Sequence, residues 1–117
     1  FVNILVSEET MRATKGILFR DIDMVRVKGK DNPITIYEPI AELAKSSTEL
    51  QEKITTWNAM IKSYRLQHWG DAESKLQGLI AADANNKLYQ LYAERITLFK
   101  TNPPPTDWDG VTKFDTK

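Results

Sequence analysis

Residues 23–40, with the sequence DMVRVKGKDNPITIYEPI, contain two apolar runs that flank a polar turn. Lys28 and Lys30 stand on either side of Gly29 in this turn, and Pro33 precedes the second run. Two β-branched runs separated by a glycine-containing turn predict a β-hairpin. Gly29 permits the positive φ of a tight turn, and Pro33 is tolerated at the first residue of a strand. The two lysines indicate either a solvated turn or a site that grips an anion.

The residues before the hairpin predict a strand and a short helix. The run VNILV at 2–6 is continuously apolar, which is typical of a buried strand. Ser7 is expected to cap a helix that begins with two glutamates and ends near Gly16. The strand that enters the hairpin alternates imperfectly, which indicates a bend or bulge at 21–23. Forty such residues bury little core, so we expect the end of a larger α/β domain, cut from a longer protein.

Residues 41–102 change to a helical period and predict three helices. Thr48 and Gln51 predict a capping box at the start of the first, and Asn86 is expected to cap the third. Three apolar stripes at helical spacing are Leu50, Ile54, Trp57, Ile61 and Tyr64; Ala72, Leu76, Leu79 and Ile80; and Leu88, Leu91, Tyr92, Ile96 and Phe99. Short connections predict antiparallel neighbours. Three prolines at 103–105 end the third helix.

Composition narrows the classes of function. The 117 residues carry 16 basic and 16 acidic side chains, so the overall charge favours neither nucleic acid nor an anionic membrane as a partner. The chain has no cysteine, which excludes disulfides and thiolate chemistry. The predicted class is α+β, with a strand–helix–hairpin part at 1–40, a three-helix unit at 41–102 and a proline-rich terminal segment at 103–117.

Three segments together resemble a known family. ILVSEET at 4–10, FRDIDMVRVKGK at 19–30 and PITIYEPI at 33–40 resemble, in order and spacing, the end of the class III adenylate/guanylate cyclase catalytic domain. The remainder is similar to the tail of many bacterial cyclases, where a tetratricopeptide-like helix pair precedes a proline-rich segment. The matching positions are Tyr64, Trp69, Ala72 and Leu76, followed by NPPPTDWDGV at 102–111.

The resemblance implies a parent enzyme that is a phosphorus–oxygen lyase. It would convert ATP to cyclic AMP and pyrophosphate with two Mg or Mn ions between the catalytic domains of a homodimer. Lys28 matches the lysine that contacts the terminal phosphates in the family, and Lys30 is expected to be an accessory charge. The family's metal-binding aspartates and base-selecting residues have no counterpart here, so the resemblance implies an inactive fragment without catalytic or metal residues and leaves GTP open as substrate.

The resemblance also carries expectations about location and partners. We expect a cytoplasmic segment, without nucleic-acid or direct membrane contact, of a parent anchored in the inner membrane. An alternative interpretation is a helical interaction or dimerisation module, and another is a structural cap on the catalytic domain. Both alternatives predict that Lys28 does not matter.

The remaining candidate residues favour structural roles. Trp57, Tyr64 and Trp69 stand at helical spacing, which favours core packing over an aromatic ligand cage. Trp108 is expected to pack back onto the helices, because an exposed indole is costly. His68 lacks a second histidine, and the aspartates of TDWDG at 106–110 suit a turn better than a cation site.

Overall fold

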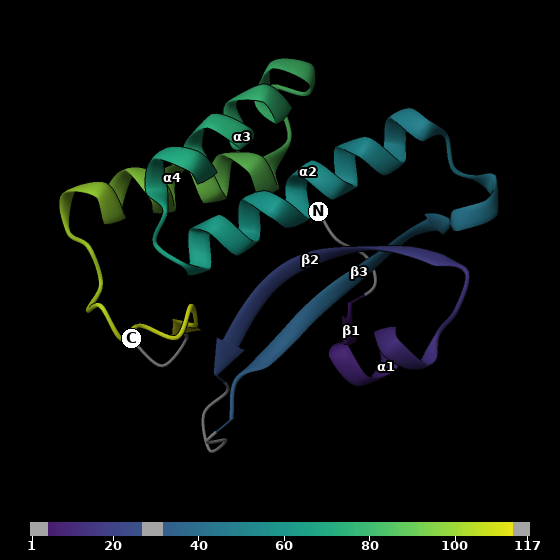
Figure 1. Ribbon diagram of the computed structural model, residues 1–117, viewed down its shortest axis with the longest axis horizontal. Coiled ribbons are helices and arrows are strands. Elements are labelled where there is room, and N and C mark those ends of the chain that lie inside the picture. Colours follow the sequence, from purple (N-terminus) through teal and green to yellow (C-terminus); the bar gives the residue numbers. More distant parts are fainter. Residues whose placement is uncertain (1–4, 27–31, 114–117) are drawn as a thin grey trace. The chain divides into compact units, whose positions relative to one another are not determined.

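The computed structural model describes residues 5–26 and 32–113 of the chain, and it confirms the α+β class (Figure 1). The elements follow in the order β1 (Val6–Ser7), α1 (Glu8–Ala13), β2 (Ile17–Arg26), β3 (Ile34–Glu42), η1 (Leu43–Lys45), α2 (Thr48–Arg65), α3 (Trp69–Ala82), α4 (Lys87–Thr101) and β4 (Thr112–Lys113). The predicted succession of strand, helix, hairpin and three helices is therefore present.

The chain forms two compact units, and their division falls inside α2. The helical unit comprises Thr55–Asp109. The sheet unit comprises the described residues up to Ile54 together with 110–113. The predicted boundaries at 40/41 and 102/103 stay a prediction.

The sheet has the strand order β1-β3-β2-β4. β3 pairs antiparallel with both β1 and β2, and β4 pairs parallel with the end of β2. A register shift falls between Asp21 and Asp23, which confirms the predicted bulge. Ile22 and Asp23 are neighbours in sequence and both are buried, as expected where simple alternation is interrupted.

Local signals at the start of the chain are largely confirmed. The Ser7 hydroxyl accepts from the amide of Thr10 at 3.3 Å, and α1 ends three residues before Gly16, whose φ is +79°. Within the described residues, however, the first strand begins only at Val6, and Leu5 is 49% exposed. Residues 2–4 of the predicted strand at 2–6 lie outside the described residues. At Leu5 the prediction of a buried strand is wrong, because among the described residues of this segment only Val6 and Ser7 pair with β3.

The predicted cap of α2 is wrong by one residue. Ser47, rather than Thr48, accepts the amide of Leu50 at 3.0 Å. Gln51 does reach backwards, but its side-chain amide donates to the hydroxyl of Ser46 at 2.8 Å. Serine and threonine offer the same capping oxygen, so the path of the chain out of η1 decides which of them caps the helix.

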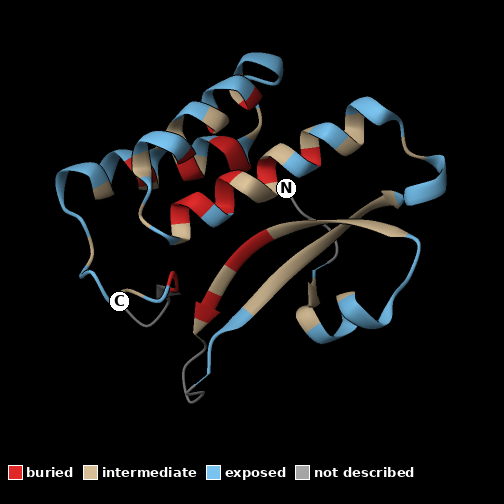
Figure 2. Cartoon of the chain, viewed as in Figure 1, coloured by how far each residue is buried: buried red, intermediate tan, exposed pale blue. Residues whose placement is uncertain are grey.

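The core of the helical unit follows the predicted stripes (Figure 2). Its buried apolar residues are Trp57, Met60, Ile61, Tyr64, Ala72, Leu76, Leu79, Leu88, Tyr89, Tyr92 and Ile96. The Trp57 ring lies 5.4 Å from the Tyr89 ring and 5.3 Å from the Tyr92 ring, measured between centroids. Such contacts add about 1 kcal/mol each beyond the burial of apolar area. Trp57 and Tyr64 are therefore core residues, as predicted.

Candidate functional site

The turn of the hairpin, with Lys28 and Lys30, lies outside the described residues. Its two flanks are described: β2 extends to Arg26 and β3 starts at Ile34. At its end, β2 pairs on one side with β3 and on the other with β4, where Arg26 stands opposite Lys113. Hydrogen bonding on both sides restrains the backbone at the end of β2.

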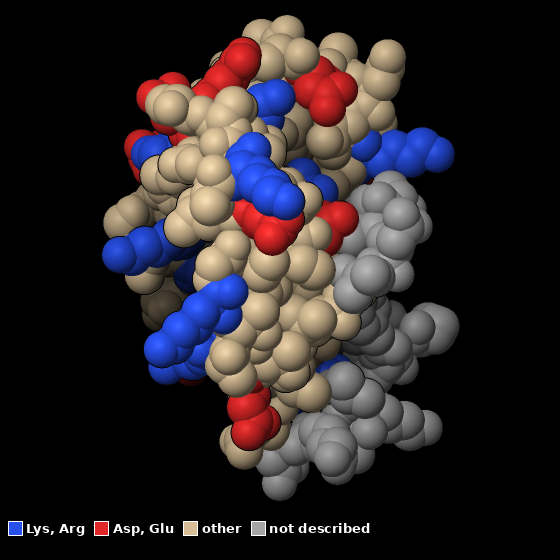
Figure 3. Space-filling model, turned by 90° about the vertical axis from the view of Figure 1, so that its right-hand side faces the viewer, with Lys and Arg blue, Asp and Glu red and all other residues tan. Residues whose placement is uncertain are grey.

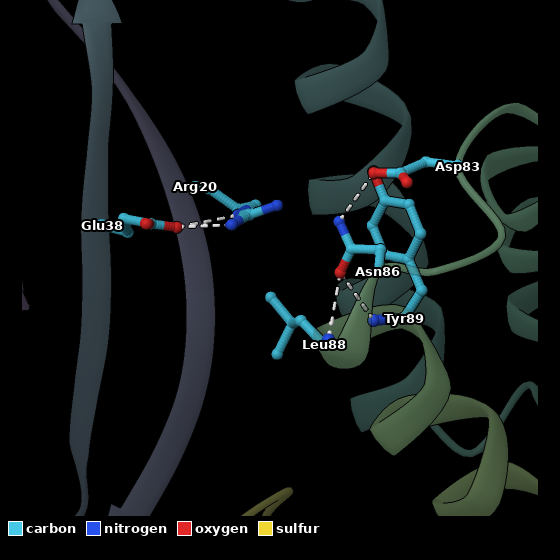
Figure 4. A network of polar contacts seen from close by, with 6 residues as sticks. All are labelled: Arg20, Glu38, Asp83, Asn86, Leu88 and Tyr89. Atoms are coloured by element: carbon cyan, nitrogen blue, oxygen red, sulfur yellow. Dashed lines mark hydrogen bonds and ion pairs between the residues drawn. The ribbon is translucent and has the colours of Figure 1, made fainter. Parts of the chain in front are cut away.

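An ion pair joins the two strands of the hairpin further from the turn (Figure 4). Arg20 Nη2 lies 2.5 Å and Arg20 Nε 3.1 Å from the same carboxylate oxygen of Glu38. The side chains are only 14% and 16% exposed, and the two residues are register partners. Removing one partner of a largely buried pair leaves the other charge uncompensated. Because each charge faces its partner, we assign the pair to holding the hairpin's register.

Next to the bulge, Asp23 places a carboxylate in the interior. It is 7% exposed, and its Oδ1 accepts the amide of Met24 at 2.9 Å. Across residues 5–26 and 32–113, no three side chains of the metal-binding types gather to hold an ion. The two-metal centre that the resemblance implies for the parent stays a prediction.

Trp108 packs against three aromatic rings of the helical unit. Tyr64 of α2, Trp69 of α3 and Phe99 of α4 supply these rings, which we call the aromatic recess. The Trp108 centroid lies 5.6 Å from that of Tyr64, 6.1 Å from that of Trp69 and 5.3 Å from that of Phe99. The prediction that Trp108 packs back onto the helices is confirmed. Each helix contributes one wall, so the recess exists only when all three are assembled.

Beside the recess, Gln67 tethers the proline-rich segment. The α2 helix ends in a Schellman arrangement, in which the His68 amide donates to Ser63 O at 2.9 Å and the Gln67 amide to Tyr64 O at 3.1 Å. Gln67 has a φ of 63°, and its side-chain amide donates to Pro105 O at 2.7 Å. Sequence reasoning missed the role of Gln67, because the left-handed residue at a helix end is usually glycine and a glutamine gives no such signal.

A polar cluster joins α2 to the first turn of α3. The hydroxyl of Ser63, a buried residue, donates to Asp71 Oδ2 at 2.5 Å, and Lys75 Nζ lies 2.6 Å from the same oxygen. These bonds, that of Lys75 foremost and that of Ser63 next, hold the pKa of Asp71 below its usual value. Only the charged carboxylate can accept both donors at full strength.

Two features of α4 were not predicted from the sequence. A shallow, mostly apolar hollow is lined by Ala93, Glu94, Thr97, Leu98, Thr101 and Asn102. Lys100 bridges to Glu73 of α3 at 2.8 Å.

Lysines and arginines are interspersed with acidic side chains over the face shown in Figure 3, as the neutral net charge suggests.

Comparisons with family models, with curated proteins and with solved structures found no match to this chain. Among the helices that the structure describes, none combines the length and the apolar character needed to cross a membrane.

Proposed function

We propose that this chain is the C-terminal portion of a class III nucleotide cyclase, and that its hairpin presents Lys28 to the triphosphate of the substrate. One observation carries the proposal: the VKGK sequence at 27–30 lies along the chain between β2 and β3, and these strands follow β1 and α1 in the order that the cyclase resemblance implies. A VKGK sequence alone would be weak support, so the order of elements gives it weight.

The chemistry of the turn suits a departing pyrophosphate. An ammonium on a short, supported hairpin is a point charge that can neutralise negative charge on terminal phosphates. Bound Mg or Mn ions would supply Lewis-acid activation in the parent. The two-sided pairing of β2 and the Arg20–Glu38 pair would hold the turn in place, which is what preorganised stabilisation of charge requires. Lys30 would add an accessory charge.

The proposal extends to the parent enzyme. It would be a homodimeric adenylate cyclase, and this chain would be a cytoplasmic segment of a protein anchored in the inner membrane. We expect the chain by itself not to cyclise ATP, because it lacks counterparts of the family's metal-binding aspartates.

Substituting Lys28 in the intact parent tests the proposal. Lys28→Ala is expected to lower kcat/KM about 100-fold or more, the usual cost of removing one preorganised charge donor. Lys30→Ala is the matched control, with the same loss of charge two residues away and a much smaller effect. Lys28→Arg should recover part of the activity. Unchanged kinetics in a folded Lys28→Ala enzyme would remove the catalytic role of the hairpin.

A further inference from the structure

The last residues that the structure describes attach the chain to both of its units. Trp108 packs in the aromatic recess of the helical unit, with its ring centroid 5.3 Å from that of Phe99. Four positions further along the chain, Thr112 of β4 pairs with Val25 of β2 in the sheet unit. The chain passes from the helical unit to the sheet unit after Asp109. One short segment therefore carries an anchor in the first unit and a strand in the second.

The anchor shortens the part of the chain that must be ordered when β4 pairs. α4 ends at Thr101, so the ten residues 102–111 precede β4. When Trp108 is packed in the recess, only the three residues 109–111 remain between the anchor and the strand. Loop-closure entropy favours the shorter connection by the ratio of the two lengths to the power three-halves, which is about sixfold.

The connection between the anchor and β4 has a restricted backbone. Gly110 is buried and has a φ of +83°, a conformation that residues with a Cβ rarely adopt. The next residue, Val111, is 5% exposed. A substitution at Gly110 therefore disturbs the connection while it leaves the aromatic ring of Trp108 in place.

β4 depends on this anchor because it is too short to be stable alone. It pairs with β2 at two positions only, Val25 with Thr112 and Arg26 with Lys113. These positions are the end of β2, directly before the VKGK sequence at 27–30. Whether β4 is paired decides whether this end of β2 has one neighbouring strand or two.

We propose that Trp108 is a positioning residue, whose packing in the aromatic recess keeps β4 paired with β2 and so restrains the strand end that leads to Lys28. The helical unit thereby gains influence over the triphosphate site, since any event that displaces Trp108 from the recess releases β4. The effect on catalysis rests on the proposed function of the hairpin, whereas the coupling between Trp108 and β4 does not.

Hydrogen exchange of the chain, followed by NMR, tests the coupling without any cyclase activity. Successive amides at the end of β2 point alternately to β3 and to β4. In Trp108→Ala the amides that face β4 should exchange about sixfold faster, and those that face β3 should change much less. Trp108→Phe, which keeps an aromatic ring, should restore most of the protection. Asn86→Ala is the matched control, because it removes the cap of α4 and leaves the recess unaltered.

A second variant covers the case in which Trp108→Ala disturbs the helices. Gly110→Ala forces a residue with a Cβ into the left-handed region, so it should also speed exchange at the amides that face β4, with the near-ultraviolet signal of the recess retained. Unchanged exchange at the end of β2 in both variants overturns the coupling. Equal acceleration by Asn86→Ala overturns it as well, because general loss of stability would then account for the effect.

Kinetics of the intact parent test the step from β4 to the triphosphate site. Trp108→Ala should lower kcat/KM by roughly two- to sixfold, no more than the change in β4 pairing. In a Lys28→Ala background it should have no further effect, because both substitutions act through the same ammonium group. An undiminished effect in that background, or none beside an impaired Lys28→Ala enzyme, overturns the positioning role. An unimpaired Lys28→Ala enzyme instead removes the proposed function and leaves the coupling seen by hydrogen exchange standing.

Discussion

Gln67 occupies the left-handed region, with a φ of 63°, at a helix end where glycine is the usual residue. Outside glycine this conformation costs about 1 kcal/mol. The bond from the Gln67 side chain to Pro105 O, 2.7 Å long, contributes about 1 kcal/mol in the opposite direction. The side chain thus offsets the strain of its own backbone, and two substitutions at this one position separate the two effects.

Gln67→Gly removes both the strain and the bond, so the free energy of unfolding should stay within about 0.5 kcal/mol of the unaltered chain. Gln67→Ala removes the bond and keeps the strain, which should cost about 1 kcal/mol. The glycine variant should therefore be the more stable of the two, against the usual order in which glycine weakens a chain through its unfolded-state entropy.

Urea unfolding followed by tryptophan fluorescence measures this difference, because all three tryptophans lie within the helical unit. With a typical urea dependence, a gap of about 1 kcal/mol separates the two midpoints by roughly 0.5 M. Both variants lose the tether equally, so the near-ultraviolet signal of the recess should change alike in both. An alanine variant as stable as the glycine variant, or more stable, would refute the reasoning about the backbone.

Two further predictions concern polar contacts of the helical unit. Asn86→Ala removes the side-chain oxygen that caps α4, which accepts two amides of its first turn, and should cost about 1 kcal/mol in thermal unfolding, whereas Asn86→Ser should recover most of it. Asp71→Asn should lower stability at neutral pH, because the lowered pKa of Asp71 means that its charged form is favoured by folding. That stabilisation is present above the ordinary aspartate pKa and is lost as pH falls through the folded pKa. The stabilities of the two proteins should therefore converge in acid, and a constant difference between pH 7 and pH 3 would contradict the role of Lys75 and Ser63.

The helices were predictable because their signals are local. A stripe repeating every three or four residues decides which side chains face inward, and Asn86 before Leu88 caps a helix with no reference to the rest of the chain. Ser47 was missed for Thr48 because both residues satisfy the same local rule. The choice between them depends on η1, whose Leu43 carbonyl accepts the side-chain amide of Gln51 at 3.4 Å.

The hairpin was predictable as an element, but its ion pair was not. Without a bulge, counting back from the paired residues Val25 and Ile34 would place Pro39 opposite Arg20. The register shift at the bulge moves Glu38 to that place instead. A shift of one residue exchanges the faces of a strand, so the partner of Arg20 cannot be assigned until the bulge is located.

The aromatic recess was half predictable for a related reason. The stripes identify Tyr64 and Phe99 as inward residues, and the cost of an exposed indole predicts that Trp108 returns to the helices. Neither signal identifies Gln67, because its role depends on one residue taking a left-handed conformation between two helices.

The bulge in β2 and the left-handed end of α2 have one feature in common. At the bulge, Asp23 accepts the amide of Met24, and at the end of α2, Gln67 donates to Pro105 O. In each case a polar side chain makes a bond at the point where the backbone leaves its regular pattern. At the bulge this bond satisfies a backbone amide that the ladder leaves free, whereas at the end of α2 it joins the irregular residue to a distant carbonyl. A test of Gln67 therefore bears on both the stability of the helix end and the attachment of the proline-rich segment to the helical unit.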